Sequence, residues 1–196
     1  MNRPMVHILN WITKKTHWSN ECDVDKRIQI QGTNNSVLIG DRTAIYNLQI
    51  VIRGNHNRLV IGEGCVAGGF MEISGNGNEI TIGDYSTISE NVRITAHGGT
   101  YIKIGSSCVI ANLGDIRTTD SHSIFDAQGD RVNCDKNIEI GDRVWLAREV
   151  IVLKGAVIGN DSVIGARSIV TKEISPNSLA VGIPARVVKK DITWLV

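Results

Sequence analysis

The sequence is poor in aromatic residues, which make up 5% of its 196 residues. This scarcity argues against a broad globular core built on Phe and Trp. It favours a thin core filled with aliphatic side chains. The length suits one domain, and no shift in composition along the chain indicates a second. Glycine is abundant by comparison, with 20 residues.

Neither charge sign is in clear excess, because 21 basic and 20 acidic residues are mixed along the chain. No basic face for nucleic acid or anionic lipid is therefore expected. No apolar run approaches the roughly 18 residues of a membrane span. The apolar patch Met5–Ile12 is interrupted by His7 and Asn10 and lacks a following small-residue cleavage site, so we interpret it as a cap and not a signal peptide.

Cysteine is also sparse, and its spacing excludes a CxxC motif. Cys65 and Cys108 are the fifth residues of IGEGCV and IGSSCV, a small position that Thr43 and Ser86 fill in related blocks. We expect these thiols to pack inward instead of serving redox or metal chemistry. No metal site is predicted, and a reducing, cytoplasmic location is expected.

What the sequence does contain is a six-residue period from Ile140 to Val181: IGDRVW, LAREVI, VLKGAV, IGNDSV, IGARSI, VTKEIS, PNSLAV. Aliphatic residues open most blocks, small or branched residues stand fifth, and Gly or Ala often stands second. A period of six fits neither an amphipathic helix nor an alternating strand. It predicts a solenoid whose first and fifth positions face a narrow interior and whose second position takes a corner.

The N-terminal half repeats with a longer step, which separates the anchors Ile39, Ile61, Ile82 and Ile104 by 22, 21 and 22 residues. From Ile104 onward the step is 18, through positions 122, 140, 158 and 176. Eight anchors predict a triangular prism of about eight coils. Glycine and asparagine recur before the first three anchors and should mark one corner, where Asn35, Asn57 and Asn78 could form a hydrogen-bond ladder.

One segment breaks the period, because position 122 is His where an aliphatic residue is expected. Polar residues then dominate up to Ile138, which predicts an extruded loop at about 121–137. The resulting organisation is an N-terminal cap (1–27), the solenoid with its loop (28–182) and a C-terminal tail (183–196). Chemistry is best sought where polar residues interrupt the repeat.

The segments TDSH, RVWLAREVIVLKGAVIG and GIPAR resemble the left-handed β-helix (hexapeptide-repeat) acyltransferases. The nearest resemblance is to bacterial O-acetyltransferases of capsular or other surface saccharides, including the sialic acid group. The resemblance implies an all-β, left-handed parallel β-helix, although parallel crossovers generally prefer the opposite hand. It also implies acetyl-CoA as co-substrate, a saccharide acceptor, and a homotrimer with its sites between subunits.

Three residues are candidates for the chemistry by this resemblance. His122 matches the catalytic histidine, and a neutral imidazole can take a proton from an attacking hydroxyl. Asp120 could orient that imidazole or bind a substrate hydroxyl. Trp145 should face outward beside the acyl donor, although an outward indole also suits a plain subunit interface. His97 is the alternative candidate for the base. It stands seven residues before Ile104, where earlier coils have glycine at a corner, and this favours a turn residue.

The resemblance places the acyl donor further along the chain. Ala147 and Ala166 are small enough to leave room for a pantetheine arm, and Ile183-Pro184 would close on the adenine end. Lys172 and Arg186 match positions that face the CoA phosphates in relatives. The alternative interpretation of Lys172 and of Arg186 is that each is an ordinary solvated charge on the surface.

Other functions fit the sequence less well. An acetyltransferase for a small amine, amino sugar or amino acid is possible, but the chain lacks the long helical N-terminal domain of serine acetyltransferases. A zinc hydratase of the γ-carbonic anhydrase type needs two histidines five residues apart, and Arg117 stands five before His122. A non-enzymatic scaffold would not need His122, Trp145 and the IPAR tail together.

Overall fold

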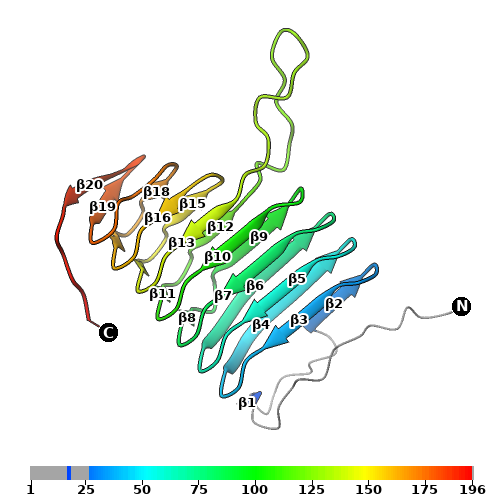
Figure 1. Cartoon of the computed structure of the whole chain (residues 1–196), viewed down its shortest axis with the longest axis horizontal. Helices are drawn as coiled ribbons and strands as arrows, with labels where there is room; N and C mark the ends of the chain where they lie inside the picture. The colour runs from blue at the N-terminus through cyan, green and yellow to red at the C-terminus, as the bar shows by residue number, and fades with distance from the viewer. Residues whose placement is uncertain (1–16, 19–26, 196) are drawn as a thin grey trace, which may run out of the picture.

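The six-residue blocks fold into short strands, and three successive sides make one coil of a prism (Figure 1). A computed structural model describes residues 17–18 and 27–195 of the chain. Strands β1 to β19 pair in parallel, and β20 returns antiparallel to β19. The chain is an all-β, left-handed parallel β-helix, which confirms the predicted fold class.

The three sides of the prism are called here face 1, face 2 and face 3. Face 1 carries β8 (Thr87–Ile88), β11 (Val109–Ile110), β14 (Trp145–Leu146), β17 (Val163–Ile164) and β19 (Leu179–Gly182). Face 2 carries β2 (Ile28–Gln31), β9 (Arg93–His97), β12 (Asp115–Arg117), β15 (Ile151–Leu153) and β18 (Ile169–Val170). Face 3 carries β3 (Ser36–Ile39), β5 (Arg58–Ile61), β7 (Glu79–Ile82), β10 (Tyr101–Ile104), β13 (Ile138–Ile140) and β16 (Val157–Ile158).

Faces 1 and 2 belong to one hydrogen-bonded sheet because two long strands run through both of them. These are β4 (Ala44–Arg53) and β6 (Val66–Ser74). The short strand β1 (His17–Trp18) pairs with the start of β4, and β20 (Ala185–Lys189) closes the sheet at its other end. The predicted cap at residues 1–27 lies almost entirely outside the described residues.

The core is a column of aliphatic side chains from all three faces. First-position residues such as Leu146 and Val152 are fully buried, and so are fifth-position residues such as Val144 and Val150. Full burial of one such side chain stabilises the fold by about 1.5–3 kcal/mol. The inward positions expected from the period are therefore confirmed.

The second position of the blocks that open on face 3 is glycine because adjacent coils come close at the corner between faces 3 and 1. A Cβ on Gly105 would lie 2.6 Å from the backbone nitrogen of Asp142 in the next coil. The small fifth positions close the same corner with hydrogen bonds. Cys108 Sγ lies 3.1 Å from the carbonyl oxygen of Gly141 in the next coil. At the equivalent position one coil earlier, Ser86 Oγ donates to the Gly105 carbonyl at 3.0 Å.

The predicted asparagine ladder is present at the corner between faces 2 and 3. Asn57 N–H donates to Asn35 Oδ1 at 2.9 Å, and Asn78 N–H donates to Asn57 Oδ1 at 2.9 Å. Asn57 Nδ2 also donates to the Gly75 carbonyl at 2.8 Å. The positive φ angles fall on the neighbouring glycines and on Asn34 and His56, so the ladder asparagines act through their side chains.

The predicted number of coils was too high by one. Ile104 pairs directly with Ile140, 36 residues later, so no coil passes through position 122. Face 3 holds six strands, followed by a single bridge between Ile158 and Ile174. The missing coil is the segment that leaves the prism between β12 and β13 (Figure 1). Among the described residues, no helix is long and apolar enough to cross a membrane.

Candidate functional site

The extruded loop emerges at the corner between faces 2 and 3, and Thr118 closes its root. Thr118 N–H donates to the Thr95 carbonyl at 3.1 Å, and its own carbonyl accepts from Lys136 N–H at 3.1 Å. Further out, Phe125 and Arg131 pair antiparallel. The loop is therefore a hairpin-like arm with a fixed base, as the long excursion in Figure 1 shows.

His122 lies on the outgoing arm with an exposed side chain. Its backbone is held on both sides, because its N–H donates to the Asp120 carbonyl at 2.8 Å and its carbonyl accepts from Asn133 Nδ2 at 2.8 Å. Ser121 before it has a positive φ of 67°. The imidazole is thus presented to solvent from a constrained turn.

Asp120 makes its contacts away from the imidazole of His122. Its carboxylate accepts a hydrogen bond from Asn133 Nδ2 at 2.9 Å and pairs with Lys154 Nζ. Lys154, from the neighbouring coil, also donates to the Asn133 carbonyl at 2.6 Å. The hydrogen bond from Lys154 is the main cause that lowers the pKa of Asp120 below its ordinary value. Asp120 therefore anchors the arm that carries His122.

Sequence reasoning missed Asn133 and Lys154, although both support His122. Asn133 is 9% exposed and its Oδ1 accepts the Ile124 N–H at 2.7 Å. The Lys154 side chain is 16% exposed. Asn133 lies in an aperiodic loop, and Lys154 stands at a corner position of the segment RVWLAREVIVLKGAVIG, where nothing in its residue type suggests this contact. Their proximity depends on the path of the loop.

His97 stands at the predicted corner, but it also has a carboxylate partner. Its Nδ1 lies 2.8 Å from Asp135 Oδ2, and the Asp135 side chain is only 6% exposed. Arg131 approaches the other carboxylate oxygen at 3.2 Å. Burial alone would raise the pKa of Asp135, but hydrogen bonds from His97 and Thr119 and the nearby positive charges lower it overall.

Trp145 faces outward from face 1 and is 38% exposed, between the inward residues Val144 and Leu146. The predicted orientation is confirmed. Its ring is tilted against Trp194 of the C-terminal tail, with centroids 6.1 Å apart. Trp194 is held there by its Nε1, which donates to the Arg143 carbonyl at 2.7 Å.

His122 and Trp145 lie on opposite sides of the prism in one chain. The loop leaves at the corner between faces 2 and 3, whereas Trp145 projects from face 1. The packed core of the prism lies between them. One chain does not unite the two predicted catalytic residues.

The predicted donor-binding residues fall into separate regions. Ala147 and Ala166 follow face 1 at its corner with face 2, and the exposed Ile183 and Pro184 form the turn between β19 and β20. The Ala147 N–H already donates to the Ile164 carbonyl of the next coil at 2.9 Å.

The two predicted phosphate-binding residues are both exposed, and they lie in different places. Lys172 follows β18 at the corner between faces 2 and 3. Arg186 lies on β20, and its Nη1 donates to the Ala185 carbonyl at 2.9 Å. Arg186 pairs with Val181, which stacks on Gly165 at the corner of Ala147 and Ala166, whereas Lys172 is separated from that corner within one chain.

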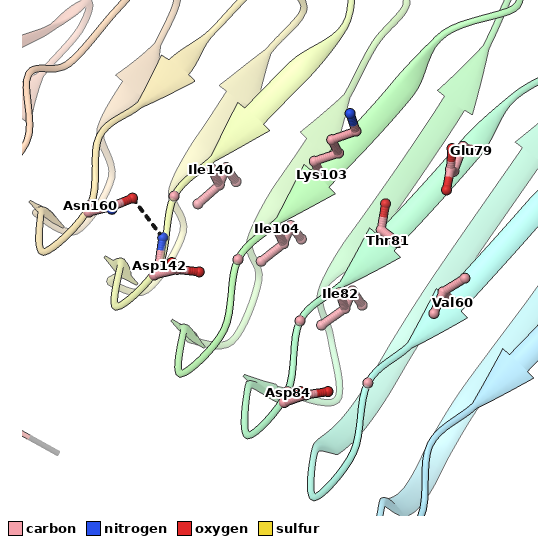
Figure 2. A pocket seen from close by; sticks show the side chains of 14 residues that line it. Val60, Glu79, Thr81, Ile82, Asp84, Lys103, Ile104, Ile140, Asp142 and Asn160 are labelled. Atoms are coloured by element: carbon pink, nitrogen blue, oxygen red, sulfur yellow. Dashed lines mark hydrogen bonds between the residues drawn. The ribbon is translucent and has the colours of Figure 1, made fainter.

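A shallow depression of about 570 Å³ lies elsewhere, along face 3 (Figure 2). Its walls include Thr81 and Lys103 and the corner residues Asp84, Asp142 and Asn160. The corner side chains bind backbone N–H groups of adjacent coils, for example Asn160 Oδ1 with Asp142 N–H at 3.0 Å. No predicted site residue lines it, and we assign it no chemistry.

Comparison with known proteins identifies the family. Residues 137–172 match the bacterial transferase hexapeptide model (six repeats). The chain is 34% identical over 130 residues to the polysialic acid O-acetyltransferase of Neisseria meningitidis, a segment covering 66% of this chain and 60% of that relative's length. It also superposes on the crystal structure of the polysialic acid O-acetyltransferase OatWY, with TM-score 0.79 and 31% identity over 86% of this chain and 87% of that one.

The chain belongs to the bacterial hexapeptide-repeat transferases. A second structure of this family, the polySia-specific acetyltransferase NeuO, has a TM-score of 0.70 and 29% identity over 86% of this chain and 88% of that chain. The resemblance expected from TDSH and GIPAR is thereby confirmed. The match to the family model stops before the C-terminal tail and begins after most of the loop.

Proposed function

We propose that this hexapeptide-repeat protein is an acetyl-CoA-dependent O-acetyltransferase that acts on a saccharide hydroxyl. The observation that supports this most is the similarity to the polysialic acid O-acetyltransferase OatWY over 86% of the chain. Because the related proteins are named for polysialic acid, this polymer is the first acceptor we propose. A cytoplasmic location is part of the proposal, because the free thiols suit a reducing compartment.

His122 is proposed as the general base. Its neutral imidazole takes the proton of the acceptor hydroxyl while the oxygen attacks the thioester carbonyl carbon of acetyl-CoA. A tetrahedral intermediate forms and collapses, the carbon–sulfur bond breaks, and the imidazolium returns the proton to the CoA thiolate. The products are the acetyl ester and CoA, and no acyl-enzyme is needed.

Trp145 is proposed to act from a neighbouring subunit. An exposed imidazole on the loop and an exposed indole on face 1 lie on opposite sides of one prism. A homotrimer would place the loop of one subunit against face 1 of the next, which unites the two groups at each seam. The indole N–H could then donate to the developing oxyanion.

The same seams would hold acetyl-CoA. Ala147 and Ala166 leave room along one corner, with Ile183 and Pro184 at its end, while Lys172 lies at the opposite corner, beside the loop root. A seam could bring these corners from two subunits together around one donor. Arg186 and Lys172 would then meet the CoA phosphates.

Acetyl transfer with purified protein tests this function. Acetyl-CoA is incubated with polysialic acid, sialic acid or a neutral galactoside, and thiol release and product mass are followed. We expect acetyl esters on polysialic acid and CoA release that depends on it. Absence of an acetylated saccharide in every arm, together with no thermal shift with CoA, would overturn the proposal.

A further inference from the structure

The pair His97 and Asp135 lies at the root of the loop and has no role in the mechanism above. Their side chains meet from elements 38 residues apart, with Nδ1 and Oδ2 separated by 2.8 Å. The carboxylate is 6% exposed, whereas the imidazole is 44% exposed. A buried acid thus holds one edge of a ring whose body reaches solvent.

This arrangement determines which nitrogen of neutral His97 carries the proton. The Asp135 carboxylate can only accept at Nδ1, so Nδ1 must be the N–H donor and Nε2 must carry a lone pair. Arg131 bonds the second carboxylate oxygen at 3.2 Å and supports the ionised form of Asp135. His97 Nε2 is therefore an acceptor suited to a hydroxyl donor.

The position of His97 is tied to that of His122 through Thr118. His97 N–H donates to Thr118 Oγ1 at 3.0 Å, and Thr118 is the residue that closes the loop root. His122 follows Thr118 by four residues, a chain reach of at most about 14 Å. Both imidazoles therefore border the same corner of the prism, between faces 2 and 3.

We propose that His97 is an acceptor-binding residue whose Nε2 accepts a hydrogen bond from a hydroxyl of the saccharide, with Asp135 as its positioning residue. This inference rests on the proposed function and extends it by naming a recognition contact. It concerns a hydroxyl other than the one that attacks, because His122 serves the attacking oxygen. Sugars are rich in such vicinal donors, and buried or oriented acceptors discriminate among them.

Two substitutions at position 97 separate recognition from loop support. His97→Asn retains an amide N–H close to the place of Nδ1, so it can still bond Asp135, but it has no counterpart of Nε2. His97→Ala removes both. With polysialic acid as acceptor, we expect both variants to raise the acceptor KM by roughly 5- to 20-fold. The Kd for acetyl-CoA should stay within about twofold in both, because neither His97 nor Asp135 is among the proposed donor contacts.

If His97 has only a structural role, the two variants should differ in their acceptor KM. His97→Asn would then match the wild type within about twofold in acceptor KM, while only His97→Ala would lose activity and thermal stability. That outcome would overturn the proposal. Asp135→Asn provides the second measurement, because the new amide can donate to Nδ1 and move the ring proton to Nε2. We expect it to raise the acceptor KM as His97→Asn does, and an unchanged KM would also count against the proposal.

Failure of this inference is distinguishable from failure of the proposed function. If wild-type protein acetylates the saccharide and His97→Asn does so equally well, only the role of His97 falls. If wild-type protein acetylates no saccharide, the transferase proposal falls and takes the recognition contact with it.

Discussion

At the scale of single residues, the proposed base His122 is supported by neighbours whose own residue types did not suggest that role. The backbone of His122 is held by Asn133, which in turn bonds Asp120, and Lys154 ties both to the adjacent coil. Contacts that hold the backbone of His122 in place matter because a base must stay within hydrogen-bond reach of the proton that it takes. Asp120 therefore fits a positioning role through Asn133 better than a direct contact with the imidazole.

The first prediction concerns His122→Ala. If the imidazole is the general base, kcat should fall by roughly 10²–10⁴-fold, while the Kd for acetyl-CoA stays nearly constant. Steady-state kinetics and calorimetric CoA titration measure the two effects. His56→Ala is the matched control, because His56 is an exposed corner histidine remote from the loop. A kcat within a few-fold of the wild type would contradict the assignment and leave His97 as the remaining candidate base.

The second prediction concerns the thiols. Burial raises the pKa of Cys108 to about 11, and it also raises the pKa of Cys65. At pH 8 both thiols are therefore protonated and buried. Because the thiolate is the reactive form, they should react slowly. In a Cys22→Ser background, native protein at pH 8 should react with a disulfide reagent at Cys134 alone, since that side chain is exposed. Labelling of all three thiols at equal rates would contradict the buried positions.

At the scale of elements, two corners of the prism are stabilised by columns of side chains that the repeat brings into register. Asn57 is 1% exposed and serves the coils on both sides of it. A ladder of this kind satisfies backbone groups that a sharp corner would otherwise leave unpaired. The corners therefore contribute to the stability of the coil in addition to the aliphatic column.

The third prediction follows from this ladder. Asn57→Ala leaves the Gly75 carbonyl and the Asn78 N–H without their partners in a buried corner. We expect a loss of about 2–4 kcal/mol in the free energy of unfolding, measured by urea denaturation. Asn112→Ala is the control, because Asn112 is exposed on another corner and should change stability by less than about 0.5 kcal/mol. Equal effects of the two substitutions would argue against the ladder.

At the scale of the whole molecule, the prism itself separates the two groups that the proposed mechanism needs together. Within one chain the loop leaves at one corner and the indole projects from the opposite face. Exposed Ile124, Phe125 and Val132 on the loop, each 57–60% exposed, also suit burial against a neighbour. The assembly is therefore proposed as part of the active site.

The fourth prediction is complementation between inactive subunits. His122→Ala and Trp145→Ala subunits, each inactive alone, should form mixed trimers in which some seams combine an intact His122 with an intact Trp145. Random mixing of equal amounts should restore about one quarter of all seams, and in the doubly purified mixed trimers about one seam in three should combine both groups. Co-expression with two different affinity tags and assay of the doubly purified protein measures this. No recovery of activity, or a 21.4 kDa monomer in sedimentation, would contradict a shared site.

The sequence by itself determined the coil. Its period of six places Leu146, Val150 and Val152 inward and Gly141 at a corner, because every block repeats the same local choice of large and small residues. The outward direction of Trp145 and the departure of the chain near position 122 follow from the same period.

Only the tertiary structure decided what meets at the loop root. His97 with Asp135 and Lys154 with Asp120 are pairs 38 and 34 residues apart, and one member of each lies in an aperiodic loop. No repeat specifies where such a loop returns, so these contacts depend on the path that its own packing selects. The separation of His122 from Trp145 likewise arises from the three-sided shape, which becomes visible only once the coils are stacked.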